Sequence, residues 1–102
     1  MIPLIQDNRA RVETACREHG VDHLDVFGSA VSGNFRDDSD LDFIAEFGGE
    51  RTGIADRYLS FAEALEAIFG RRVDLLTERS IRNPFFRRAV ERQRQRVYER
   101  QS

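Results

Sequence analysis

The stretch that decides the fold is residues 26–47, VFGSAVSGNFRDDSDLDFIAEF. It begins with the end of a short apolar run, turns at Gly28-Ser29 and returns as a segment of alternating apolar and polar residues. Alternation over residues 41–47 is typical of a half-buried β-strand, because successive side chains point to opposite faces. The same alternation places Asp40 and Asp42 on one face. The stretch therefore predicts two strands joined through a turn, with acidic side chains at the start of the second.

The pattern on both sides of this stretch alternates between helical and extended spacing. Gly20 and Gly70 are suited to end helices, and Asn83-Pro84 is suited to begin one. The spacing predicts helices over 4–19, 54–69 and 83–93, a helical turn over 29–34, and strands over 21–27, 41–47 and 71–77, while 95–99 fits a helix or a strand. This order predicts an α/β (α+β) fold, a small mixed three- to four-stranded sheet with helices packed on it.

The chain has 102 residues, of which 40% are apolar and 33% charged, with a net charge of −2. A chain of this length forms one domain, residues 1–102, with a modest core. All sixteen basic residues are Arg, so a phosphate would be bound by Arg or by backbone amides. Residues 1–78 hold eight Arg and sixteen acidic residues, whereas 79–102 hold eight Arg and two acidic residues. This asymmetry indicates an acidic, cation-binding body with a basic tail, or a solvated tail helix that neutralises its own domain.

Several classes of protein are excluded or disfavoured by composition. Cys16 is the one cysteine, so the chain holds no internal disulfide and this side chain is expected in the core. No apolar run has membrane-spanning length and the N-terminus has no leader, so we expect a cytoplasmic protein without a membrane partner. His19 and His23 are interpreted as surface or packing residues. The body is acidic and no nucleic-acid-reading motif is present, so nucleic acid is an unlikely partner.

Three acidic residues lie where a purely structural role would not place them. Asp40 and Asp42 share a strand face, and Asp74 interrupts the apolar run Val73, Leu75, Leu76 in the next strand. If the two strands are neighbours, we expect the carboxylates about 5 Å apart, and each pair then repels by roughly 3 kcal/mol. Hard oxygen ligands of this kind suit two Mg²⁺ ions, or Mn²⁺, which can hold a phosphoryl or nucleotidyl group during transfer.

Gly28-Ser29 supplies a second element of such a site. Backbone amides at the start of a helical turn bind phosphate oxygens, and glycine lets the ligand approach closely. The turn has no Lys, which excludes a Walker-type P-loop, and the register of DDSDLDF excludes an EF-hand. Taken singly, each motif also fits a structural reading: a Gly-Ser pair is often only a turn, and a strand acid can protect a sheet edge.

Together these residues resemble a known superfamily. Gly28-Ser29, ten intervening residues, Asp40-Leu41-Asp42 and a later strand carboxylate at Asp74 resemble the signature of the DNA polymerase β-type nucleotidyltransferases. The flanking FGS at 27–29, Gly33 and SDLDF at 39–43 match as well. The small size resembles the minimal nucleotidyltransferase branch, whose members act as antitoxins of HEPN-domain RNases. The resemblance covers about residues 10–98.

The resemblance implies a role for each matched residue. Gly28 and Ser29 would hold the phosphates of ATP, Asp40 and Asp42 would bind both metal ions, and Asp74 would bind the catalytic metal and help to deprotonate the acceptor. The implied reaction is Mg²⁺-dependent transfer of AMP from ATP to a Tyr of a HEPN-domain RNase toxin, which inactivates that toxin.

One departure concerns the phosphate side of the site. Many minimal members carry a basic residue after Gly-Ser, where this chain has Val31-Ser32-Gly33. Arg36 is the candidate replacement, and Ser39 of the matched run is assigned to the nucleotide site with it. The departure keeps open the alternative of a non-catalytic antitoxin that neutralises its toxin by binding. A second alternative, independent of the departure, is a small-molecule nucleotidyltransferase of the antibiotic-modifying kind. The second is disfavoured, because 102 residues leave no domain for such an acceptor.

Overall fold

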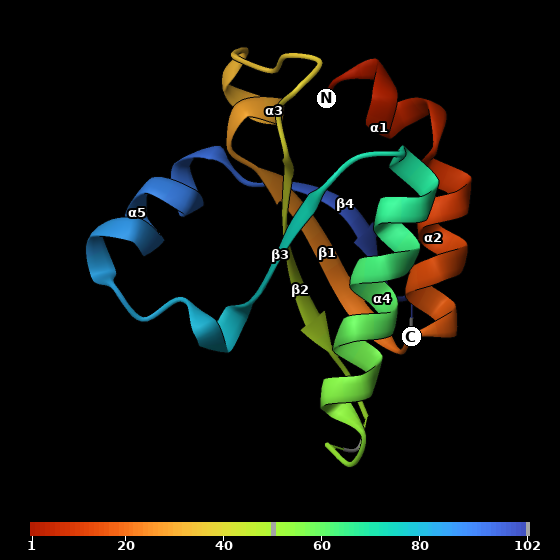
Figure 1. Ribbon diagram of the computed structural model, residues 1–102. Coiled ribbons are helices and arrows are strands. Elements are labelled where there is room, and N and C mark those ends of the chain that lie inside the picture. Colours follow the sequence, from red (N-terminus) through yellow and green to blue (C-terminus); the bar gives the residue numbers. More distant parts are fainter. Residues whose placement is uncertain (50, 102) are drawn as a thin grey trace.

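The described residues of the computed structural model, 1–49 and 51–101, form one mixed four-stranded sheet with helices on both faces (Figure 1). The strand order is β3-β2-β1-β4. β1 is antiparallel to β2 and β4, whereas β2 and β3 are parallel. The strands are β1 (Val21–Phe27), β2 (Leu41–Phe47), β3 (Val73–Thr77) and β4 (Gln95–Glu99). The predicted fold class is confirmed.

The helices are divided unequally between the two faces of the sheet. Figure 1 shows α2 and α4 side by side against one face, while α5 stands apart on the other. The bounds are α1 (Pro3–Asp7), α2 (Arg9–Glu18), α3 (Ser29–Ser32), α4 (Ile54–Phe69), α5 (Pro84–Gln93) and a 3₁₀ turn, η1 (Glu78–Ser80). The predicted helices over 54–69 and 83–93 are therefore confirmed to within one residue.

The prediction of one helix over 4–19 is wrong, because the helix breaks at Asn8. Asn8 has φ −108° and ψ 11°, and its side-chain amide donates to the Leu4 carbonyl at 2.8 Å. Such a bond between side chain and backbone competes with the helical hydrogen-bond pattern. Two other predictions change less: the strand expected from residue 71 begins at Val73, and the segment 95–99 is the strand β4.

The face under α2 and α4 holds most of the core. Its members are apolar and most are fully buried, and Cys16 is among them as predicted. At the centre, Phe43 of β2 stacks on Phe69 with 5.8 Å between ring centroids, and Phe61 packs edge-on against Phe47 at 5.9 Å. The buried members are Ile5, Val12, Ala15, Cys16, Val21, Leu24, Val26, Ala30, Leu41, Phe43, Ala45, Phe61, Leu65, Phe69, Leu75, Val97 and Tyr98.

The face under α5 has a much smaller apolar cluster, formed by Phe27, Ile44, Ile81 and Val90. Beside it lies Asp25, which is 3% exposed. Two guanidinium groups pair with its carboxylate: Arg94 at 2.6 Å and Arg96. Arg94 also pairs with Glu78 of η1 at 2.7 Å. These bonds fasten the C-terminal segment to β1, so the basic tail belongs to the folded body.

Among the described residues, no helix combines the length and the apolar character that crossing a membrane requires.

Candidate nucleotidyltransferase site

The parallel pairing of β2 with β3 brings two of the predicted acidic residues side by side. Asp42 is the register partner of Asp74. Because side chains alternate along a strand, Asp42 shares its face with Ile44, and Asp74 shares its face with Leu76. Ile44 and Leu76 both belong to the cluster under α5. The two carboxylates therefore lie on the α5 face, near the end of the sheet where β2 and β3 begin.

Asp42 has the most perturbed carboxyl group of the site. Burial raises the pKa of Asp42 from 3.8 to about 6, with further contributions from the charges of Asp74 and then Asp40. The protein therefore holds negative charge here at an energetic cost, which a bound cation would relieve. The prediction that these three acids influence one another is consistent with this shift.

Gly28, at the start of the turn, lies directly against the Asp42 carboxylate. Its φ is 74°, in the left-handed region that glycine adopts without strain. A Cβ at this position would lie 2.3 Å from the Asp42 Oδ2 atom, so no larger side chain fits while Asp42 keeps its place. Thirteen residues lie between Gly28 and Asp42 in the sequence, but the fold brings the two residues into contact.

Ser29 begins the short turn α3 immediately after Gly28. The amides of Val31 and Ser32 both donate to the Gly28 carbonyl at 3.0 Å, which closes the turn. The first amides of a helix have no partner within it. The Gly28 amide donates to Oε1 of Gln93, the last residue of α5, at 3.3 Å. Sequence reasoning missed Gln93, because no local signal connects two residues that are 65 positions apart.

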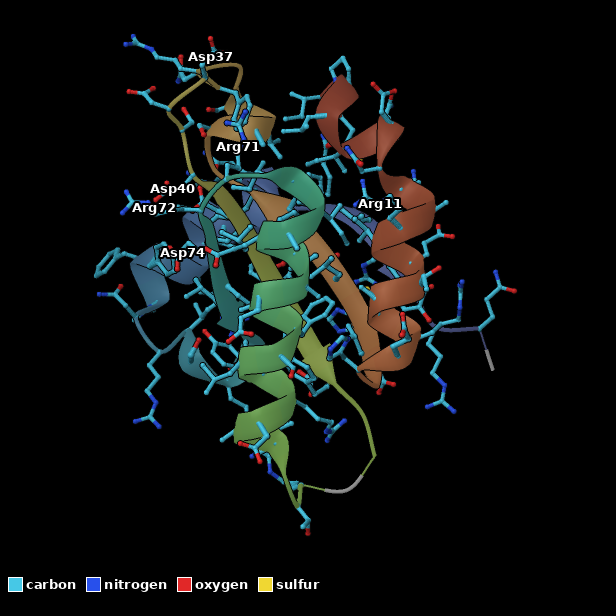
Figure 2. The ribbon with its side chains drawn as sticks, turned by 45° about the vertical axis from the view of Figure 1, so that its right-hand side comes forward. Arg11, Asp37, Asp40, Arg71, Arg72 and Asp74 are labelled. Carbon is cyan, nitrogen blue, oxygen red and sulfur yellow. The ribbon has the colours of Figure 1, made fainter. Side chains whose placement is uncertain are left out.

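Asp40 lies just before β2, and its carboxylate accepts a hydrogen bond from Arg72 Nε at 3.4 Å. Figure 2 shows Asp40 beside Arg72, with Asp74 further along the neighbouring strand. In this arrangement, residues 1–49 and 51–101 contain no group of three or more His, Cys, Asp or Glu side chains placed to hold a metal ion. The Arg72 side chain is 85% exposed, so solvent screens its pair with Asp40 and the pair holds the carboxylate only weakly.

The loop before β2 is organised by Arg71, which sequence reasoning also missed. Its guanidinium donates to the carbonyls of Arg36 at 3.2 Å and Ser39 at 3.0 Å, and it lies 4.6 Å from the centroid of the Phe35 ring. The Ser39 hydroxyl accepts from the Arg36 amide at 2.9 Å. Both predicted nucleotide ligands thus lie in a loop held by Arg71 above the carboxylates, and their ligand roles stay predictions.

The donor set fits divalent cations in its chemistry. Asp40, Asp42 and Asp74 offer only carboxylate oxygens, the ligands that Mg²⁺ and Mn²⁺ prefer. The raised pKa of Asp42 is the structural observation that supports the fit, because burial and then the charges of Asp74 and Asp40 disfavour its ionised form, which a bound cation would favour. Because Gly28 has no Cβ, its backbone can lie directly against the Asp42 carboxylate.

The model of the nucleotidyltransferase domain family matches residues 9–97. The chain belongs to this family. Two curated relatives agree. A Methanocaldococcus jannaschii protein, whose name proposes protein adenylyltransferase activity, is 35% identical over 72% of this chain and 74% of its own length. The protein adenylyltransferase MntA of Thermococcus cleftensis is 38% identical over 63% of this chain and 63% of its own length. The chain is therefore an enzyme of the nucleotidyltransferase class.

Solved structures share this fold. One described as a proposed minimal nucleotidyltransferase is 36% identical, with a TM-score of 0.71 over 89% of this chain and 93% of its own. A complex of the tri-AMPylated HEPN toxin of Shewanella oneidensis with an MNT antitoxin matches with a TM-score of 0.65 at 18% identity, over 94% of this chain and 73% of the other. At that identity the second match supports the fold alone.

Proposed function

We propose that this nucleotidyltransferase is the antitoxin of a HEPN-domain RNase toxin and transfers AMP from ATP to a tyrosine of that toxin, in the cytoplasm. The observation that carries the proposal is the pairing of Asp42 with Asp74 beside Gly28, with a raised pKa at Asp42. The name of the Thermococcus cleftensis relative supports the choice of a protein acceptor. The HEPN toxin is proposed as that acceptor by analogy with the Shewanella oneidensis complex.

In the proposed reaction, the acceptor hydroxyl oxygen forms a bond to the α-phosphorus of ATP. The bond from that phosphorus to the bridging oxygen of the β-phosphate breaks, and pyrophosphate leaves with the electron pair. The hydroxyl proton passes to the carboxylate of Asp74, which is exposed at the sheet edge. Gly28 and the Ser29 turn bind the phosphates, and Arg36 and Ser39 lie in the loop beside them. Two Mg²⁺ ions, bound by Asp40, Asp42 and Asp74, would supply positive charge to the triphosphate.

The test is transfer of AMP in a purified system. The chain, ATP, Mg²⁺ and a HEPN-domain RNase from the same genome are combined, and intact-mass spectrometry measures the addition of one AMP group per event. We expect Asp42→Ala/Asp74→Ala to abolish transfer. The matched control is Asp37→Ala, because Asp37 is an exposed aspartate at the loop tip, away from the paired strands (Figure 2). Transfer by the double variant at the wild-type rate would contradict the proposal.

Neutralisation by binding alone is the second candidate. It is favoured by Val31-Ser32-Gly33 in place of a basic residue and by the bond from Arg72 to Asp40. Co-expression of the RNase with Asp42→Ala/Asp74→Ala separates the two mechanisms. Restored growth would favour neutralisation by binding, whereas toxicity with an intact complex would favour AMP transfer.

A further inference from the structure

The outward side of α5 exposes an aromatic and basic surface. Four residues recur there at helical spacing and are all exposed; we call Phe85, Arg88, Ala89 and Arg92 the α5 stripe. Phe85 is 74% exposed, the highest value for a large apolar side chain of the described residues. The Arg88 guanidinium lies 5.1 Å from the centroid of the Phe85 ring, and its Nε donates to the Pro84 carbonyl. An arginine held over an exposed aromatic ring is typical of the central contacts in protein interfaces.

The α5 stripe borders the nucleotidyltransferase site. Phe86, the next residue, packs edge-on against Phe27 with 6.2 Å between ring centroids, and Phe27 precedes Gly28. At the other end of the helix, Gln93 accepts from the Gly28 amide. One side of α5 therefore contacts Phe27 and Gly28, and the neighbouring side, which carries the stripe, faces solvent. A molecule bound to the stripe would therefore lie next to the turn at Gly28.

The charged members of the α5 stripe are both arginines. Within the part of the chain that the structure describes, Arg92 and Arg82, which precedes the helix, have no ion-pair partner. The acid of α5, Glu91, lies three positions after Arg88 along the helix, and its carboxylate pairs with Arg87 and Arg94. The complementary surface of a partner therefore carries carboxylates.

The edge of the sheet nearest the site does not accept a strand. The Val73 amide donates to Glu66 at 3.1 Å, the Leu75 carbonyl accepts from the Tyr58 hydroxyl, and the Thr77 amide donates to the Ser80 hydroxyl at 3.2 Å. Side chains thus occupy the outward backbone groups of β3, and pairing with an extended peptide would break these bonds. A partner near this site is expected to bind through side chains, and a helix fits the spacing of the stripe.

We propose that the α5 stripe docks the protein that receives the nucleotidyl group, through a helix of that protein that presents carboxylates around an apolar side chain. The apolar side chain packs on Phe85, and the carboxylates pair with Arg88 and Arg92. This docking holds the acceptor hydroxyl on the side of the sheet where Asp74 lies. The inference rests on the proposed function for the identity of the partner, and binding can be measured without any transfer.

The test measures affinity for the purified HEPN-domain RNase by titration calorimetry. Phe85→Ala and the double variant Arg88→Glu/Arg92→Glu are each expected to weaken binding at least about tenfold. The matched control is Leu59→Ala on α4, because Leu59 is also exposed, at 57%, but lies on the helix layer of the opposite sheet face. It is expected to leave the affinity within about twofold of wild type. All substituted side chains are exposed, so circular dichroism should show unchanged folding.

Several outcomes would overturn the docking proposal: both α5 variants binding the RNase as tightly as wild type, Leu59→Ala weakening binding equally, or a wild-type chain that does not bind the RNase. A single-stranded RNA probe forms the second arm. Loss of RNA binding by Arg88→Glu/Arg92→Glu with RNase affinity unchanged would assign the stripe to nucleic acid and overturn the proposal. Stripe-dependent binding of the RNase without AMP transfer would support docking while contradicting the proposed function.

Discussion

The two faces of the sheet use the same strands for different purposes. On β2, Leu41, Phe43 and Ala45 enter the core under α2 and α4, whereas Asp42 and Ile44 face α5. The first face is apolar and covered by two helices. The second has one helix, a four-residue apolar cluster, buried ion pairs and the carboxylates of the site. One face therefore supplies most of the apolar stabilisation, and this allows the other face to hold the charged residues of the site.

The face under α5 replaces apolar burial with pairing of charges. Asp25 is 3% exposed, and a carboxylate so buried is tolerated because Arg94 and Arg96 both bond to it. Such pairs add little stability compared with an apolar core of equal size, but breaking one is costly. They fix the position of α5 and β4 relative to β1, and so the position of Gln93 at Gly28.

The largest expected effect is on the apolar face. Phe61→Ala removes a fully buried ring and should lower the free energy of unfolding by about 3–5 kcal/mol. Val90→Ala on the α5 face, where the side chain is 2% exposed, should cost about 1–2 kcal/mol, because less buried volume is lost. Urea titrations measure both values. Equal losses of unfolding free energy would contradict the inference that the apolar face supplies most of the stability.

The next effect is on the buried ion pairs. Arg94→Ala leaves Asp25 with one cationic partner and should cost about 2–3 kcal/mol, below the usual value for a broken buried pair because Arg96 remains. The hydrogen bond from Arg94 holds the pKa of Glu78 below its ordinary 4.5. The Glu78 part of this stability is therefore present above pH 4.5 and is lost as pH falls through the lower folded pKa.

The control for this substitution is Arg100→Ala. Arg100 pairs with Asp22 at 3.4 Å, but its side chain is 66% exposed. We expect a loss within about 0.5 kcal/mol. A loss as large as that of Arg94→Ala would show that burial does not determine how much these ion pairs contribute to stability.

A gain in stability is expected at the site itself. The pKa of Asp42 is raised from 3.8 to about 6, so the folded chain binds this proton more tightly than the unfolded chain does. Stability of the wild type therefore falls as pH rises through this interval. Asp42→Asn does not titrate and should be more stable at pH 7 by about 1 kcal/mol, a value discounted for partial exposure, or roughly 4–8 °C in Tm.

Thermal unfolding in the presence of a chelator measures this difference. It should shrink as the pH is lowered from 6 through 3.8, below which the wild-type carboxyl is mostly protonated in both states. A variant less stable than wild type at pH 7 would contradict the assignment of Asp42 as a strained carboxylate.

The smallest effect is expected at the rim of the site. Arg72 pairs with Asp40 at 3.4 Å with its side chain 85% exposed. Arg72→Gln should change the free energy of unfolding by less than about 0.5 kcal/mol, because solvent screens the pair. A larger change in the free energy of unfolding, measured by urea titration, would show that this exposed pair contributes as much stability as the buried pairs.

Most of the secondary structure could be predicted because its signals are local. The alternation over 41–47 and the apolar stripe of 54–69 each reflect a face that must be buried, and both predictions are confirmed. The prediction of one helix over 4–19 was wrong because the apolar periodicity there is weak and the Asn8 side chain forms a hydrogen bond to the Leu4 carbonyl where the helix breaks. Residues 95–99 stayed undecided because their pairing with β1 depends on contacts about 70 positions away.

The reactive groups of the site can be read from residue types and spacing alone: a Gly-Ser turn, a D-x-D pair and a later strand acid. How these groups meet depends on contacts between distant segments. The register of β2 with β3 sets Asp42 beside Asp74, the close approach at Gly28 leaves no room for a Cβ, and Gln93, Arg71 and Arg72 reach the site from distant segments. Local patterns determine which secondary structure each segment can form. The register of the strands and the long-range contacts are selected by the total free energy of packing, which no single segment contains.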